Sequence, residues 1–159
     1  MIKVLFVCLG NICRSPLAEA IFLDEIEKRD LDSRLSADSA GTAGYHIGDL
    51  PDSRSRENAQ RNGVTIAHRA RQFHSDDFEE FDYILAMDHS NYRHIAGMAE
   101  RLDLKADHLH LMRSFQVDGA QQEVPDPYYG GSQGFQQVFD ILLDANQRFI
   151  DYLVKTHQL

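Results

Sequence analysis

The stretch VLFVCLGNICRSPLAEA, from Val4 to Ala20, joins an apolar segment to the start of a helix. Its first half is a continuous apolar run with β-branched residues, which is typical of a strand buried on both faces of a parallel sheet. Pro16 suits the first turn of a helix, where a missing N–H group removes no hydrogen bond. We therefore expect a strand over 2–8, a tight turn, and a helix that begins near Ser15.

The rest of the chain continues this alternation of strands and helices. Further strands are predicted over 34–41, 81–88 and 107–112, and further helices over 53–63, over 90–102 with Ser90 as N-cap, and from 135 to 153. A long loop rich in Gly and Pro is expected over 118–134. This order predicts an α/β fold: a single domain over 1–159 with three αβα layers, a four-stranded parallel sheet and flavodoxin-like, doubly wound connections.

Composition narrows the classes of function. The 159 residues carry a net charge of -9, which argues against nucleic acid as a partner because phosphate backbones bind basic surfaces. No apolar run approaches the length of a membrane span, and no signal peptide is expected. The 2 cysteines lie too close together for a secreted disulfide framework. We expect a cytoplasmic protein with reduced thiols, monomeric by default.

The turn after the first strand carries residues suited to binding an anion. The N–H groups of a short loop and of a helix N-terminus can converge on one anion, and the helix end adds a positive dipole. Gly10 and Asn11 tolerate the tight winding that such a loop needs. Arg14 supplies a planar guanidinium that can hold two phosphate oxygens. The same field favours the thiolate form of Cys8, to which the Ser15 hydroxyl can donate a hydrogen bond.

A structural interpretation of this turn carries less weight. A cysteine at the end of a strand is often a plain core residue. Here, however, an arginine and a serine follow Cys8 six and seven residues later, between a buried strand and a helix start. The rival phosphate motif, a glycine-rich loop that ends in lysine, does not occur in the sequence. The pattern therefore favours a catalytic cysteine.

These segments resemble the low-molecular-weight protein tyrosine phosphatases. The resemblance covers nearly the whole chain, through CLGNICRSP, LAEAIF, DSAGT, HRARQ, FDYILAMD and DPYYG in the order of the family. It implies that Cys8 is the nucleophile that forms a phosphocysteine and that Arg14 holds the phosphate. It also implies that Asp126 is the general acid and then the base. The implied substrate is a phosphotyrosine-containing protein or an aryl phosphate, with inorganic phosphate as product and competitive ligand.

The resemblance assigns supporting roles as well. Asn11 and Ser15 would hold the loop, His68 would support them from behind, and Asp88 matches a buried carboxylate. The remaining residues implied to contact the phosphate or the phenyl ring are Leu9, Gly10, Ile12, Cys13, Tyr45, Tyr128 and Tyr129. No cofactor and no metal are implied, and the 8 histidines show no convincing metal-ligand spacing.

Cys13 has two interpretations. The resemblance implies that a second cysteine at this place can form a disulfide with Cys8 and so prevent irreversible oxidation of the thiolate. Alternatively, Cys13 is a small residue that packs the loop.

Three other functions remain open on this scaffold. Arsenate reductases of similar fold need additional downstream cysteines, and Cys8 and Cys13 are the only 2 in this chain. Protein arginine phosphatases of similar sequence carry a threonine where this chain has Ile12, and a bulkier apolar side chain favours a phenyl ring over a guanidinium. A non-catalytic phosphate-binding module would leave Asp126 without a role.

Overall fold

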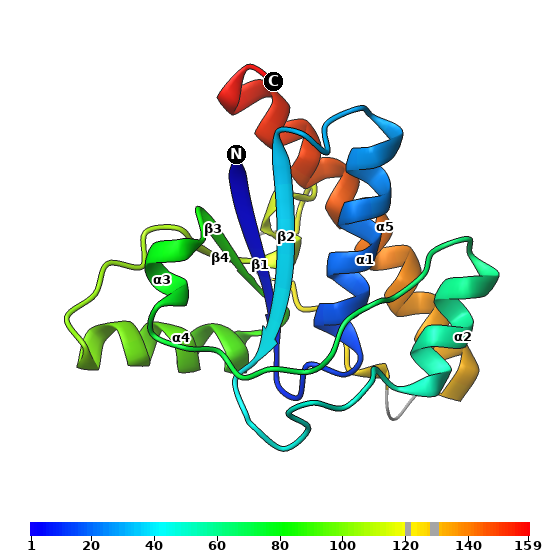
Figure 1. Ribbon diagram of the computed structural model, residues 1–159, viewed down its shortest axis with the longest axis horizontal. Helices are drawn as coiled ribbons and strands as arrows, with labels where there is room; N and C mark the ends of the chain where they lie inside the picture. The colour runs from blue at the N-terminus through cyan, green and yellow to red at the C-terminus, as the bar shows by residue number, and fades with distance from the viewer. Residues whose placement is uncertain (120–121, 128–130) are drawn as a thin grey trace.

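The computed structural model describes residues 1–119, 122–127 and 131–159. Its described strands form one parallel sheet in the order β2-β1-β3-β4 (Figure 1). The strands are β1 (Ile2–Cys8), β2 (Leu35–Gly41), β3 (Tyr83–Ala86) and β4 (Leu109–Leu111). The predicted α/β architecture with a four-stranded parallel sheet is therefore confirmed.

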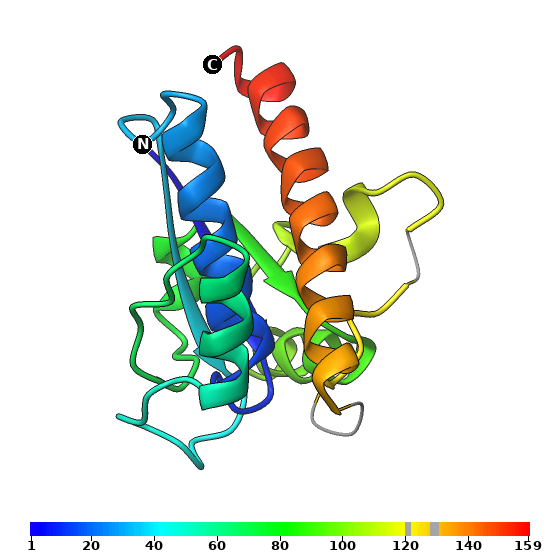
Figure 2. The ribbon, with the colours of Figure 1, turned by 90° about the vertical axis from the view of Figure 1, so that its right-hand side faces the viewer.

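Helices cover both faces of the sheet. One face carries α1 (Arg14–Lys28) and α5 (Gly131–His157), which lie side by side, with α2 (Ser53–Arg61) packed against α5 (Figure 2). The opposite face carries α3 (Asp77–Glu80) and α4 (His89–Arg101). A 3₁₀ turn, η1 (Met112–Phe115), follows β4. No described helix combines the length and the apolar character that crossing a bilayer would require.

The central strand explains the continuous apolar run at the start of the chain. Val4 and Phe6 join the core beneath α1 and α5, whereas Leu5 and Val7 join the core beneath α4. All four side chains are fully buried, because neighbouring residues of a strand point to opposite faces and both faces are covered. The apolar run of β1 thus contributes side chains to the hydrophobic cores on both faces of the sheet.

Some boundaries differ from the sequence predictions. The predicted N-cap Ser90 is wrong, because α4 begins at His89 and the Asp88 carboxylate accepts a 2.7 Å hydrogen bond from the backbone N–H of Asn91. Aspartate is as good an N-cap as serine, and it precedes the helix by one residue. The last helix begins at Gly131, which has a φ of 60°, four residues before its apolar pattern. The short elements α3 and η1 were not predicted.

The topology places a crevice directly after β1. Strand β1 pairs with β2 on one side and with β3 on the other, so the chain leaves β1 where the strand order reverses. Ligands of doubly wound sheets bind at this switch point, beyond the carboxyl ends of the strands. Cys8 is the last residue of β1 and therefore lies at this point.

Candidate active site

The turn after β1 forms a loop over residues 8–15, called the anion loop below. Cys8 is buried at its floor, and the Sγ atom of Cys8 lies 3.0 Å from the Oγ atom of Ser15. Ser15 is the second residue of α1, so the first turn of this helix faces the sulfur. The positive end of the helix and the guanidinium of Arg14 therefore lie on the same side of the sheet as the sulfur.

Asn11 organises the inside of the anion loop. It is fully buried and has a φ of 57°, the left-handed conformation that asparagine tolerates better than most residues. Its Nδ2 atom donates to the Oγ atoms of Ser15 at 2.8 Å and Ser39 at 3.0 Å. Its Oδ1 atom accepts from the backbone N–H of Arg71 at 2.9 Å and from Nε2 of His68 at 2.8 Å. One amide therefore joins the loop to β2 and to the segment after α2.

These contacts fix the direction of the hydrogen bonds around the sulfur. A backbone N–H can only donate, so the contact with Arg71 defines Oδ1 of Asn11 as the acceptor, and Nε2 of His68 must carry a hydrogen. Ser15 accepts from Asn11, so its own proton is available for the sulfur of Cys8. Its other acceptor, the carbonyl oxygen of Ala40, lies farther away at 3.4 Å.

A buried carboxylate lies behind this network. The Oε1 atom of Glu19 accepts from the Ser39 hydroxyl at 2.8 Å and lies 3.2 Å from Nδ1 of His68. Burial raises the pKa of Glu19 to about 7, and burial also lowers the pKa of His68. Both pKa shifts favour the uncharged forms of Glu19 and His68, because desolvation disfavours charge. Glu19 was not identified from the sequence, although it lies four residues after Ser15 on the same side of α1.

The same region contains a cluster of potential metal ligands. Glu19, Asp38 and His68 offer ligand atoms that all lie within 4.8 Å of one another. Sequence spacing did not indicate this cluster, since its members come from α1, from β2 and from the segment after α2. Arg71 already neutralises Asp38, because its Nε atom donates to Oδ2 of Asp38 at 2.9 Å.

Arg14 is held in place from behind. Its Nη1 atom donates to Oδ2 of Asp88 at 2.8 Å and to the carbonyl oxygen of Val124 at 3.0 Å. Burial alone would lower the pKa of Arg14, because it disfavours the charged form. The negative charges of Cys8 and Asp88 have the larger combined effect, and the pKa of Arg14 is raised. The guanidinium therefore stays charged, and two fixed contacts restrict its orientation toward the anion loop.

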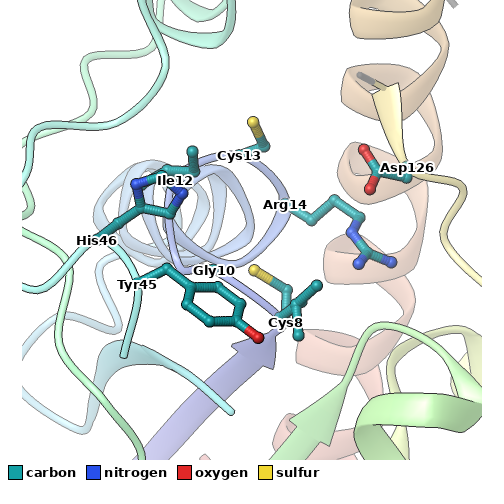
Figure 3. A pocket seen from close by; sticks show the side chains of 9 residues that line it. Cys8, Gly10, Ile12, Cys13, Arg14, Tyr45, His46 and Asp126 are labelled. Carbon is teal, nitrogen blue, oxygen red and sulfur yellow. The ribbon is translucent and has the colours of Figure 1, made fainter. Parts of the chain in front are cut away.

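The open side of the anion loop is a pocket of about 170 Å³. Figure 3 shows Tyr45 and His46 on one side of Cys8, and Arg14 and Asp126 on the other. The pocket is lined by Cys8, Leu9, Gly10, Ile12, Cys13, Arg14, Tyr45, His46 and Asp126. The structure thus gathers most of the predicted phosphate and substrate residues around one cavity. The predicted residues Tyr128 and Tyr129 lie outside the described residues.

His46 was not identified from the sequence. Its Nδ1 atom lies 3.2 Å from Oδ2 of Asp49, and its ring borders Gly10, where a Cβ atom would lie 3.2 Å from Cδ2 of the ring. Gly10 therefore leaves room for a neighbouring side chain through its missing Cβ atom.

The end of β2 packs directly on the anion loop. The backbone N–H of Thr42 donates to the carbonyl of Cys8 at 2.9 Å, and that of Ala43 donates to the carbonyl of Leu9 at 3.0 Å. A Cβ atom on Gly41 would lie only 2.7 Å from the carbonyl oxygen of Leu9. Only glycine fits this approach of two backbones.

Cys13 differs from Cys8 in its chemistry. Both cysteines are free thiols, and Cys13 is half-buried at the wall of the pocket. Burial, reinforced by the negative charge of Asp52, raises the pKa of Cys13 to about 12. At neutral pH this residue is therefore a thiol and a poor nucleophile.

The fold and the site together define a class of protein: a doubly wound α/β protein with a cysteine at the floor of an anion loop and an arginine beside it. The family model for low molecular weight phosphotyrosine protein phosphatases matches residues 3–159. The chain belongs to this family.

Individual relatives agree with this assignment. The chain is similar to the low molecular weight phosphotyrosine protein phosphatase of Schizosaccharomyces pombe, with 45% identity over 94% of this chain and 95% of the relative. A crystal structure of a protein tyrosine phosphatase from Entamoeba histolytica is 42% identical, covers 100% of both chains and has a TM-score of 0.88. A crystal structure of an arginine phosphatase from Drosophila is 33% identical, covers 96% of this chain and 98% of its own, and has a TM-score of 0.85.

Proposed function

We propose that the protein hydrolyses phosphotyrosine through a phosphocysteine on Cys8. In the first step the thiolate attacks phosphorus, an S–P bond forms, and the P–O bond to the tyrosine ring breaks. Asp126 gives its proton to the leaving phenolate oxygen. In the second step a water oxygen bonds to phosphorus while its proton returns to Asp126, and the S–P bond breaks to release inorganic phosphate and the thiolate.

The observation that carries this proposal is the shared pocket of Cys8, Arg14 and Asp126. A phosphate at the anion loop would contact the sulfur and the guanidinium together. Arg14 would then stabilise the equatorial oxygens of the transferring phosphoryl group, where negative charge gathers in the transition state. Asp126 would face the leaving group from the pocket edge. Leu9, Gly10, Asn11, Ile12, Cys13 and Ser15 would complete the phosphate site as loop residues.

The walls of the pocket support an aromatic leaving group. Ile12 and Tyr45 present apolar surface near the entrance, and the side chain of Tyr45 is highly exposed at 79%. A phenyl ring can pack against such a wall, whereas the guanidinium of phosphoarginine would need polar partners there. The Drosophila relative makes arginine phosphatase the second candidate, and Ile12 argues against it for this chain. We further propose a monomeric, cytoplasmic enzyme that uses neither cofactor nor metal and acts on phosphotyrosine-containing proteins.

A side-by-side assay tests this function. Phosphotyrosine peptide, phosphoarginine protein and arsenate with thioredoxin are offered to the parent, to Cys8→Ser and to Asp126→Ala. We expect the parent to prefer phosphotyrosine, Cys8→Ser to be inactive, and Asp126→Ala to lose roughly 10²–10⁴-fold in kcat. A trapped phosphocysteine in acid-quenched parent, seen by mass spectrometry on the peptide that contains Cys8, would identify the intermediate. A parent that prefers phosphoarginine or arsenate would overturn the proposal.

A further inference from the structure

A second pocket of about 230 Å³ adjoins the catalytic one. The two pockets share three wall residues, Leu9, Arg14 and Asp126. The second pocket extends away from Cys8 toward the N-terminus of α4, where Asp88 and Asn91 contribute to its wall together with Glu123. Glu123 and Asp126 are exposed at its rim, so the pocket opens to solvent beside the site of catalysis.

The charge of this second pocket is negative. Asp88 and Glu123 supply two carboxylates, and Arg14 supplies the single guanidinium among the residues that line it. Asp126 adds no charge in the first step, because there it carries the proton that it donates. Arg14 is already engaged with Asp88 at 2.8 Å. When a phosphate dianion occupies the anion loop it neutralises Arg14 further, so the second pocket becomes a better site for a cation as substrate binds.

The helix N-terminus does not reverse this preference. Two of the N–H groups at the start of α4 are already satisfied by carboxylates of the pocket. The backbone N–H of His89 donates to Oε2 of Glu123 at 2.8 Å, and that of Asn91 donates to Oδ1 of Asp88 at 2.7 Å. Arg113 approaches Glu123 only at its carbonyl oxygen and does not line the pocket. An anion would therefore meet two N–H groups that already have acceptors, and two carboxylates.

One buried acceptor in the pocket wall requires a donor. Asn91 is only 2% exposed, and within the described ranges nothing donates a hydrogen bond to its Oδ1 atom. A buried carbonyl oxygen without a donor is unfavourable, because it has lost its bonds to water. Asn91 lines the pocket, and a ligand that carries N–H groups matches the carboxylates beside it.

We propose that this second pocket binds the ammonium or guanidinium group of a lysine or arginine in the substrate, close in sequence to the phosphotyrosine. The inference rests on the proposed phosphatase function and names a sequence preference for it. The shared wall explains why the cation belongs to the substrate: a residue next to the phosphotyrosine can reach across Leu9 and Asp126 while the phosphate occupies the anion loop. The site is thus selective for basic phosphopeptides.

The test uses phosphotyrosine peptides that differ in one residue. Lysine, norleucine or glutamate is placed in turn at the two positions on either side of the phosphotyrosine, and kcat/KM is measured for each peptide. The measured quantity is kcat/KM for the lysine peptide divided by kcat/KM for the norleucine peptide. A change in the chemical step that affects both peptides equally cancels in this ratio. At the best position we expect a ratio of roughly three, falling toward one in 1 M salt.

Two variants locate the preference. Glu123→Gln keeps an oxygen that can accept from the N–H of His89 but removes the charge, and it should reduce the lysine-to-norleucine ratio by about half. Glu79→Gln makes the same charge change on α3, outside the pocket, and should leave the ratio as in the parent. A ratio of one at every position, or a ratio that Glu123→Gln does not lower, would overturn the inference. Failure of the parent to hydrolyse p-nitrophenyl phosphate would instead overturn the proposed function.

Discussion

Asp88 serves Arg14 and helix α4 with different oxygens of one carboxylate. Oδ2 accepts from Nη1 of Arg14 at 2.8 Å, and Oδ1 accepts from the backbone N–H of Asn91 at 2.7 Å. The first turn of α4 and the guanidinium beside the anion loop are therefore positioned by the same side chain. A change at Asp88 should act on both.

Replacing Asp88 separates these two roles. Asp88→Asn can keep the N-cap but loses the charged partner of Arg14, so kcat/KM for aryl phosphate should fall about tenfold or more through misplacement of the guanidinium. Inhibition by inorganic phosphate should weaken in parallel. Asp88→Ala also removes the cap and should cost about 1 kcal/mol more in the free energy of unfolding than Asp88→Asn. Unchanged phosphate inhibition in Asp88→Asn would contradict this role.

Asn11 allows backbone and side-chain effects to be measured apart. Asn11→Ala loses four hydrogen bonds and must also hold alanine at a φ of 57°. Asn11→Gly loses the same bonds without the penalty for a left-handed residue. Urea unfolding should show both variants strongly destabilised, with the glycine variant more stable by about 1 kcal/mol. Equal stability of Asn11→Gly and the parent would show that the amide contacts contribute little.

Glu19 should make stability depend on pH. Its carboxyl pKa is about 7 in the folded protein against 4.5 as the ordinary value, so the folded state binds the proton more tightly. Stability from this group is therefore present below pH 4.5 and is lost as the pH rises to 7, by at most about 3 kcal/mol. Glu19→Gln mimics the protonated form.

The difference in unfolding free energy between Glu19→Gln and the parent isolates this effect. His68 titrates in both proteins, and its lowered pKa acts in the opposite direction, with stability lost as the pH falls below 6.5. Urea titrations at several values between pH 4.5 and 8 should show the unfolding free energy of Glu19→Gln increasing relative to that of the parent as the pH rises. A constant difference over this range would mean that Glu19 keeps the same charge throughout.

The two thiols should react at very different rates. Because the pKa of Cys13 is about 12, iodoacetamide at pH 7 should label Cys8 and leave Cys13 largely unmodified, as read by mass spectrometry of peptides. Inorganic phosphate should slow the labelling of Cys8 by occupying the anion loop. Labelling of Cys13 as fast as Cys8 would contradict the assignment.

The protective disulfide can be tested separately. Peroxide treatment followed by reduction should restore more activity in the parent than in Cys13→Ala, if Cys13 traps an oxidised Cys8 as a disulfide. Non-reducing mass analysis before reduction would show the loss of two hydrogens. Equal recovery in both proteins would leave Cys13 with a packing role only.

The general acid should make the rate depend on the leaving group. In the proposed mechanism Asp126 donates a proton to the leaving oxygen, so Asp126→Asn should lose much more kcat on phenyl phosphate than on p-nitrophenyl phosphate, whose leaving group needs little protonation. Equal losses on the two substrates would remove Asp126 from the role of acid.

Local sequence predicted the parts of the site that are local in the chain. The anion loop, from Cys8 to Ser15, is contiguous and flanked by a strand and a helix with clear patterns. The left-handed backbone at Asn11 follows from its position in that turn. Asp126 could be chosen only through the family resemblance, since it follows the loop by more than one hundred residues.

The supporting network could not be derived in the same way. Ser39, Glu19 and Arg71 come from β2, from α1 and from the segment after α2, and only the folded sheet brings them together around Asn11. The cap of α4 was misplaced for a related reason. Ser90 and Asp88 are both good N-caps, and the choice between them depends on where Arg14 needs a carboxylate.

Gly41 touches no substrate in the proposed mechanism, yet a side chain there would strike the carbonyl oxygen of Leu9. The conformation of the anion loop therefore depends partly on the neighbouring strand β2, whose end packs against the loop backbone without space for a side chain. A saturation mutagenesis experiment scored on phosphatase activity should mark this position as intolerant as the nucleophile. Engineers who reshape the loop for another oxyanion would have to redesign the end of β2 together with it.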